Sequence, residues 1–220
     1  MRQVTQSDAP ELAQLIRATG LDHNPDPERI ARVSLENNHV TLVETTVDGT
    51  LIGFVDAFST ISAFGTLRWE VDLLGVHPTH RGQGIAQSLV REVVKSGQAI
   101  GMTHARALVY VDNGASTKTF QRCGFTPDEA IQHLCVSERS VNEATLAPAS
   151  AHLLPVSTLT YTGLWIEGEP SLEALRCAQA VRTRYRWDVA GVVLRAANDT
   201  AAQAAGYDLV GEYRWLRLLL

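Results

Sequence analysis

The chain has 220 residues, of which 45% are hydrophobic and 20% charged, and this composition argues against disorder over most of its length. Its 24 acidic and 19 basic side chains give a formal charge of −5, which argues against a protein that binds the phosphate backbone of nucleic acids. No apolar run reaches the ~18 residues of a membrane-spanning helix, and the first residues lack the apolar core of a signal peptide. The three cysteines lack metal or disulfide-framework spacing, so the cytoplasm is the expected compartment.

Helices come first in the predicted order, followed by strands alternating with helices. Asp48-Gly49 between two β-rich runs is a strong hairpin signal. A mixed α/β sheet is therefore the predicted fold class. The predicted elements are helices at 9–17 and about 25–37, strands at 40–44, 51–58 and 67–76, a helix from 85 to about 96, a strand at 105–111, a short helix at about 115–122 and a strand at about 132–137.

The last third of the chain repeats part of this order. Residues 141–155 have no clear hydrophobic period and are predicted to be a linker between domains at 1–140 and 156–220. In the second domain, Gly206-Tyr207 follows a short helix as Gly124-Phe125 does in the first, which predicts a degenerate half-copy of residues 67–138. An unrelated small α/β lobe is the alternative. The predicted elements of this domain are a strand at 158–166, a helix at 171–185, a strand at 189–195, a short helix at 200–205 and a strand at 213–219.

One segment, between a predicted strand and a predicted helix, carries recognisable chemistry. It consists of Arg81, Gly82, Gln83, Gly84, Ile85 and Ala86. The two glycines let an anion approach the backbone, the helix start offers unpaired N–H groups, and the arginine suits phosphate oxygens. A Walker loop is excluded because its Gly-Lys-Ser/Thr is missing, and a dinucleotide fingerprint because its third glycine is missing. The segment therefore predicts a seat for a pyrophosphate.

This loop resembles the acyl-CoA loop of the GCN5-related N-acetyltransferase (GNAT) family, Arg/Gln-x-x-Gly-x-Gly/Ala. Leu74-Gly75-Val76 before the loop and Gly124-Phe125 after the short helix extend the resemblance. It implies acetyl-CoA as co-substrate, no metal, and a pantetheine arm bound by the backbone around Leu74, Gly75 and Val76. It further implies that the N–H groups of 82–86 hold the pyrophosphate. The remaining cofactor contacts that it implies are Asn113 on the far side of the split strands, Ser116 and Phe120.

Acyl transfer to an amine needs a group that accepts the amine proton. Glu70 is the first choice, because it stands eleven residues before Arg81, the spacing of the catalytic glutamate in histone-acetylating members of the family. Asp72, two residues further on, is the second choice. Either carboxylate could instead be the ion-pair partner of Arg68 or Arg106.

The resemblance also shows one departure. Many members have a tyrosine that protonates the leaving thiolate, and Phe120 stands at its position. Ser116, Thr117 and Cys123 lie near enough on the same helix to be considered in its place.

The predicted function is transfer of an acetyl group from acetyl-CoA to a primary amine of a small molecule or peptide. A non-catalytic acyl-CoA-binding or regulatory protein and a dimerising scaffold are the alternatives. In the second domain, Glu167 and Glu169 precede the helix where a diphosphate would bind, so no acyl-CoA is expected there. We expect no nucleic-acid or membrane partner, whereas a homodimer is compatible with the sequence.

Overall fold

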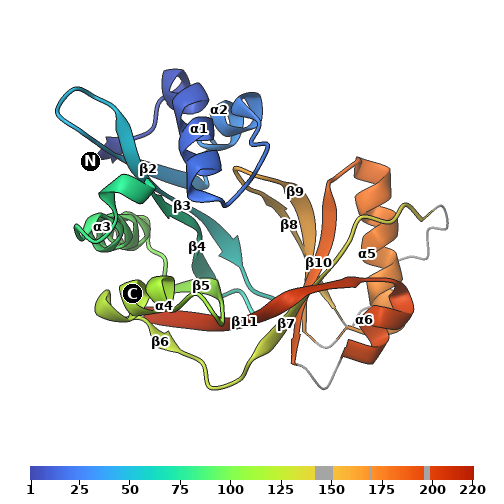
Figure 1. The fold of residues 1–220 in the computed structure, drawn as a ribbon. Helices are drawn as coiled ribbons and strands as arrows, with labels where there is room; N and C mark the ends of the chain where they lie inside the picture. The colour runs from blue at the N-terminus through green and yellow to red at the C-terminus, as the bar shows by residue number, and fades with distance from the viewer. Residues whose placement is uncertain (142–150, 169, 196–198) are drawn as a thin grey trace. The chain divides into compact units, whose positions relative to one another are not determined.

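The computed structural model describes residues 1–141, 151–168, 170–195 and 199–220 (Figure 1). These residues form two compact units, and each is described by itself. Unit 1 consists of residues 1–108, 114–127 and 216–220, and unit 2 of residues 109–113 and 128–215.

The sheet of unit 1 is mixed. Four antiparallel strands follow one another in the order β1-β2-β3-β4, β5 is parallel to β4, and β6 pairs with the end of β11. The strands are β1 (Arg2–Gln3), β2 (His39–Thr45), β3 (Leu51–Ile61), β4 (Leu67–Val76), β5 (His104–Tyr110), β6 (Thr126–Pro127) and β11 (Asp208–Leu219). The mixed α/β class predicted from the sequence is confirmed.

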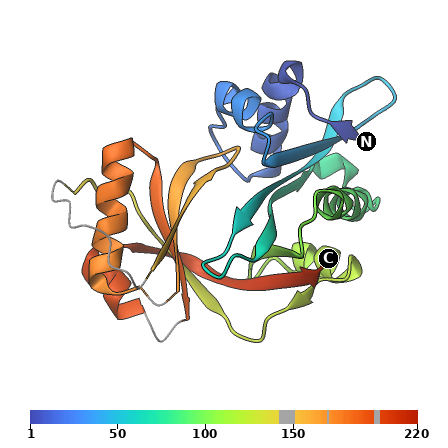
Figure 2. The same cartoon turned by 180° about the vertical axis from the view of Figure 1, so that it is seen from behind.

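Helices cover both faces of this sheet, as the two opposite views show (Figures 1 and 2). The α-helices of unit 1 are α1 (Ala9–Thr19), α2 (Pro27–Val33), α3 (Ile85–Ala99) and α4 (Gly114–Arg122), and short 3-10 helices lie at Gln6–Asp8 and Pro78–His80. The buried indole of Trp69 donates to the Val93 carbonyl at 2.9 Å and lies against Gly97 of α3, where a Cβ would come within 2.8 Å of the ring. Helix α1 packs on the other face, because a Cβ on Gly75 would meet Thr19. This packing fixes β4 between α1 and α3.

Strand β4 carries a bulge at Asp72. On β3, Asp56 lies opposite Leu73 and Ala57 opposite Val71, so Asp72 is the extra residue. The pairing of β4 with β5 ends before this bulge, at Glu70 and its partner Arg106. Because a bulge bends its strand and redirects a side chain, β4 separates from β5 from this point onward.

The strands of the second unit follow the order β8-β9-β10-β7-β11, in which β9 and β10 are parallel and the other neighbours antiparallel. Its elements are β7 (Gln132–Ser137), β8 (His152–Ser157), β9 (Thr162–Glu167), α5 (Leu172–Tyr185), β10 (Val189–Arg195) and α6 (Asp199–Ala205), followed by most of β11. Its core is formed by apolar side chains of both helices and the central strands, among them Leu164, Ile166, Leu175, Ala178, Val192 and Leu194.

The units differ from the domains predicted at 1–140 and 156–220. Strand β7 belongs to unit 2, and Leu216–Leu220 belongs to unit 1. The predicted linker at 141–155 runs into β8, while its part at 142–150 lies outside the described residues. The predicted strand at 158–166 begins only at Thr162, because a turn precedes it in which the Thr158 N–H donates to the Tyr161 carbonyl. The assignment of these strands to units depends on pairing between residues distant in sequence, which local sequence patterns do not reveal.

Helices α4 and α6 end in the same way. The N–H of Phe125 donates to the Phe120 carbonyl, and the N–H of Tyr207 donates to the Ala202 carbonyl, five residues back in each case. A left-handed glycine precedes both aromatic residues, with φ of 92° at Gly124 and 80° at Gly206. The half-copy stays a prediction, and this shared ending is consistent with it.

Candidate active site

The glycine loop enters α3 in the conformation that an anion site needs. Gly82 and Gly84 have φ of 78° and 80°, a region that disfavours any residue with a Cβ, and an added Cβ at either would meet nothing within 4 Å. The Ser88 N–H donates to the Gly84 carbonyl, which is the first i→i−4 bond of α3. The N–H groups of Ile85 and Ala86 therefore precede the intrahelical ladder and point from the helix start, where the dipole favours negative charge.

Arg81 joins this loop to the end of β4. Its Nε donates to the Val76 carbonyl at 3.1 Å, and the residue is exposed, as are Gly82 to Gly84. A carbonyl oxygen has two lone pairs, so Val76 can accept a second hydrogen bond. The loop, the strand end and one guanidinium thus lie close together in unit 1.

The end of β4 holds the residues expected to contact a pantetheine arm. Leu74 and Val76 are half-buried and pair with Val55 and Gly53 of β3 on one side. The other side of this stretch lies beyond the last register pair with β5. Packing explains why residue 75 is a glycine, because a Cβ there would lie 2.4 Å from the ring of Phe54. The sequence alone does not reveal this contact. The backbone edge of 74–76 is the part of unit 1 that an extended ligand could join.

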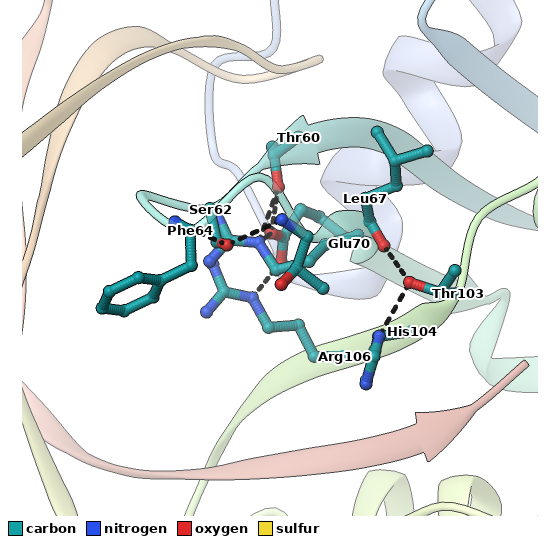
Figure 3. A network of polar contacts seen from close by, with 10 residues as sticks. Thr60, Ser62, Phe64, Leu67, Glu70, Thr103, His104 and Arg106 are labelled. Atoms are coloured by element: carbon teal, nitrogen blue, oxygen red, sulfur yellow. Dashed lines mark hydrogen bonds and ion pairs between the residues drawn. The ribbon is translucent and has the colours of Figure 1, made fainter.

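Glu70 lies in a polar network on the sheet (Figure 3). Thr60 Oγ1 donates to Glu70 Oε1 at 2.6 Å, and Arg106 Nε donates to Oε2 at 2.7 Å. Arg68 Nε lies 3.4 Å from Oε1 and donates to Thr60 Oγ1 at 3.1 Å. The Glu70 side chain is only 10% exposed. Its role as the base stays a prediction, and its contacts fit the alternative in which it is the ion-pair partner of Arg68 and Arg106.

Asp72, the second choice, has a different environment. It is exposed, and it stands on the bulge just beyond the last pair of β4 and β5. Protein around the carboxylate nevertheless reduces its hydration, and this desolvation, with the nearby Asp56 charge, raises the pKa of Asp72 to about 7; His39 opposes the rise and Glu70 adds to it. A carboxylate that titrates near neutrality and reaches solvent has the properties of a general base.

Phe120 takes the position of the missing tyrosine as a core residue. It is 3% exposed, and its ring meets Phe125 edge-on with centroids 5.0 Å apart. Cys123 donates from Sγ to the Gln87 carbonyl at 3.6 Å, and burial raises the pKa of its thiol. Ser116 and Thr117 are half-buried on α4. Phe120 itself therefore cannot protonate the thiolate.

Asn113 is the one predicted cofactor contact that belongs to unit 2, so its relation to the loop stays a prediction. Sequence reasoning missed Thr60, Asp56 and His39. Strand alternation and the hairpin at 62–66 give signals that place Thr60 near Glu70, but no local pattern signals the bulge.

The comparisons with known proteins agree with this fold. Residues 9–125 match the model described as the acetyltransferase (GNAT) family. Because the match covers more than half of its residues, the chain belongs to the GNAT family of acetyltransferases.

Individual relatives are distant. The N-alpha-acetyltransferase RimI of Mycobacterium tuberculosis is 27% identical over 122 residues, which are 56% of this chain and 75% of the relative. A GCN5-related N-acetyltransferase structure from Sphaerobacter thermophilus covers 99% of this chain and 94% of its own, with 14% identity and a TM-score of 0.59. YncA of Salmonella typhimurium, solved with acetyl-CoA, covers 60% of this chain and 81% of its own, with 19% identity and a TM-score of 0.52. These structures show the shared fold.

Two further observations concern membrane-spanning helices and metal-binding clusters. In the part of the chain that the structure describes, no helix is long and apolar enough to cross a membrane. Over residues 1–141, 151–168, 170–195 and 199–220, no three His, Cys, Asp or Glu side chains are grouped so that they could hold a metal ion.

Proposed function

We propose that the protein transfers the acetyl group of acetyl-CoA to a primary amine, with the diphosphate held at Gly82–Ala86. The observation that carries this proposal is the pair of left-handed glycines with open space at both Cβ positions, leading into the unpaired N–H groups of α3. An added side chain at either glycine would enter the space that the diphosphate needs.

The reaction requires a neutral amine at the thioester carbonyl. As the N–C bond forms and the C–S bond breaks, the amine gives up a proton and the thiolate leaves. Asp72 is our choice for the group that takes this proton, because it is exposed, stands where β4 leaves β5, and has its pKa raised to about 7 by desolvation. Glu70 is the alternative base, and its two arginine neighbours favour a structural role.

A second candidate function rests on Phe120. Its burial against Phe125 leaves that position without a proton donor, which favours binding of acyl-CoA without turnover. A free thiol has a pKa of about 8.5, so its thiolate is a tolerable leaving group and the absence of this donor does not forbid turnover.

The experiment is release of free thiol from acetyl-CoA in the presence of a peptide with a free N-terminus, spermidine or glucosamine. Amine-dependent release that is lost in Asp72→Asn supports the enzyme. Saturable binding of acetyl-CoA without release for any amine supports the second candidate. Failure to bind acetyl-CoA contradicts both.

A further inference from the structure

Two titratable side chains are fully buried in the sheet of unit 1, next to the bulge. His39 of β2 and Asp56 of β3 both have completely buried side chains, and His39 Nδ1 lies 3.4 Å from Asp56 Oδ2. Thr41 Oγ1 donates to Asp56 Oδ1 at 2.6 Å. The His39 ring stacks on Phe58 with centroids 5.1 Å apart. A buried carboxylate and imidazole are costly to desolvate, and two apolar residues would fill this space at lower cost.

The strand registers place this pair beside Asp72. Asp56 lies opposite Thr41 on β2 and opposite Leu73 on β4, and Leu73 directly follows Asp72. His39 lies opposite Phe58, which in turn lies opposite Glu70. Directly opposed residues share a face of a sheet, and so do alternate residues along a strand. The buried pair therefore shares the face of Glu70 and adjoins the residue at which β4 bulges.

Other charged groups lie on the elements packed here. Strand β4 offers Glu70 with Arg68, and β5 offers Arg106, which is bonded to Glu70. The charged residues of α1 are engaged elsewhere: Glu11 accepts from the Leu51 N–H, and Arg17 donates to the His23 carbonyl. The charges that act on Asp72 are, in order, those of Asp56, which raises its pKa, His39, which lowers it, and Glu70, which raises it. The two members of the pair thus act in opposite directions.

We propose that His39 and Asp56 are positioning residues for acetyl transfer, a pair of opposed buried charges that governs how readily Asp72 takes the proton of the acceptor amine. This inference rests on the proposed function of Asp72 as the base. Asp56 strengthens Asp72 as a proton acceptor, and His39 restrains this effect, so that an ionised fraction of Asp72 is present near neutral pH.

The test is a pH titration of the Asp72 carboxyl group, monitored by carbon NMR. The Asp72 resonance is identified as the one that disappears in Asp72→Asn. Asp56→Asn keeps an acceptor for the Thr41 hydroxyl and removes only the charge. We expect it to lower the Asp72 midpoint by about half a pH unit or more, and His39→Gln to raise it. Thr41→Val, which breaks the hydrogen bond and keeps both charges, is the matched control and should leave the midpoint within about 0.2 unit.

Opposite shifts in Asp56→Asn and His39→Gln establish the inference. Unmoved midpoints, or shifts in the same direction, overturn it. If Asp56→Asn does not fold, the sign of the His39→Gln shift decides alone. The thiol-release assay separates this inference from the proposed function. Full release by Asp72→Asn removes Asp72 as the base whatever the midpoints do, whereas loss of release with unmoved midpoints overturns only the role of the pair.

Discussion

Arg106 Nε lies 2.7 Å from Glu70 Oε2 at the last register pair that β4 shares with β5. This contact separates the roles of two carboxylates that are two residues apart. Glu70→Gln removes the carboxylate charge that Arg106 and Arg68 contact, so we expect it to lower the free energy of unfolding by about 1–3 kcal/mol. Asp72→Asn should lower turnover by at least ~100-fold without this loss of stability. Urea unfolding and thiol release on both variants check the prediction; the reverse pattern would restore Glu70 as the base.

The raised pKa of Asp72 predicts a pH dependence. A base acts when ionised, so kcat/KM should fall tenfold per pH unit below about pH 7, where Asp72 is protonated. The stability of the fold also depends on pH, because the folded state binds the Asp72 proton more tightly than the unfolded state does. Loss of this proton therefore destabilises the fold as pH rises through 7. Asp72→Asn should therefore raise Tm more at pH 8 than at pH 5. A Tm difference that is equal at both pH values would contradict this account.

The glycine loop gives a matched pair of substitutions. Gly84 and Gly101 lie at the two ends of α3 with φ of 80° and 82°, and neither has an atom within 4 Å of an added Cβ. An alanine at either should cost roughly 1 kcal/mol of stability, because both positions are left-handed. Only Gly84→Ala should also weaken acetyl-CoA, by about tenfold or more, because its Cβ enters the diphosphate site. Calorimetric titration measures the acetyl-CoA affinity of both variants. Equal affinities of Gly84→Ala and Gly101→Ala would contradict the placement of the diphosphate.

The end of the chain tests how the units are built. Leu216 is fully buried and pairs with Pro127 of β6, while Leu219 is 75% exposed. Leu216→Ala should lower the free energy of unfolding by about 2–5 kcal/mol, whereas Leu219→Ala should change it by less than about 0.5 kcal/mol. Since Leu216 belongs to unit 1, the destabilised variant should also lose acetyl-CoA affinity at temperatures near its Tm. Undiminished stability of Leu216→Ala would contradict the burial of Leu216 in unit 1.

Much of unit 1 follows from local patterns. The hairpin at Asp48-Gly49, the amphipathic α3 and the glycine loop each depend on residues close in sequence, and each was predicted within a few residues. The mixed sheet and the family follow from these elements and the loop motif. The residues expected at the loop and at the end of β4 are joined by the hydrogen bond from Arg81 to the Val76 carbonyl, and their contact with a cofactor stays a prediction.

The remaining features depend on pairings between distant residues. The bulge at Asp72 exists only in relation to Asp56 and Ala57 of β3, so alternation along β4 alone does not reveal it. The ion pair of Glu70 with Arg106 needs β5, because Arg106 lies 36 residues away in sequence. The assignment of β7 to unit 2 and of Leu216–Leu220 to unit 1 is of the same kind. The sequence therefore predicts the position of the glycine loop better than it predicts which of Glu70 and Asp72 is the base.

A crystal structure with acetyl-CoA tests the central claim most directly. The account predicts diphosphate oxygens within hydrogen-bond distance of the N–H groups of residues 82–86, and the thioester at the separation of β4 from β5, within reach of Asp72. Acetyl-CoA bound elsewhere on the protein, with those N–H groups exposed to solvent, would contradict it.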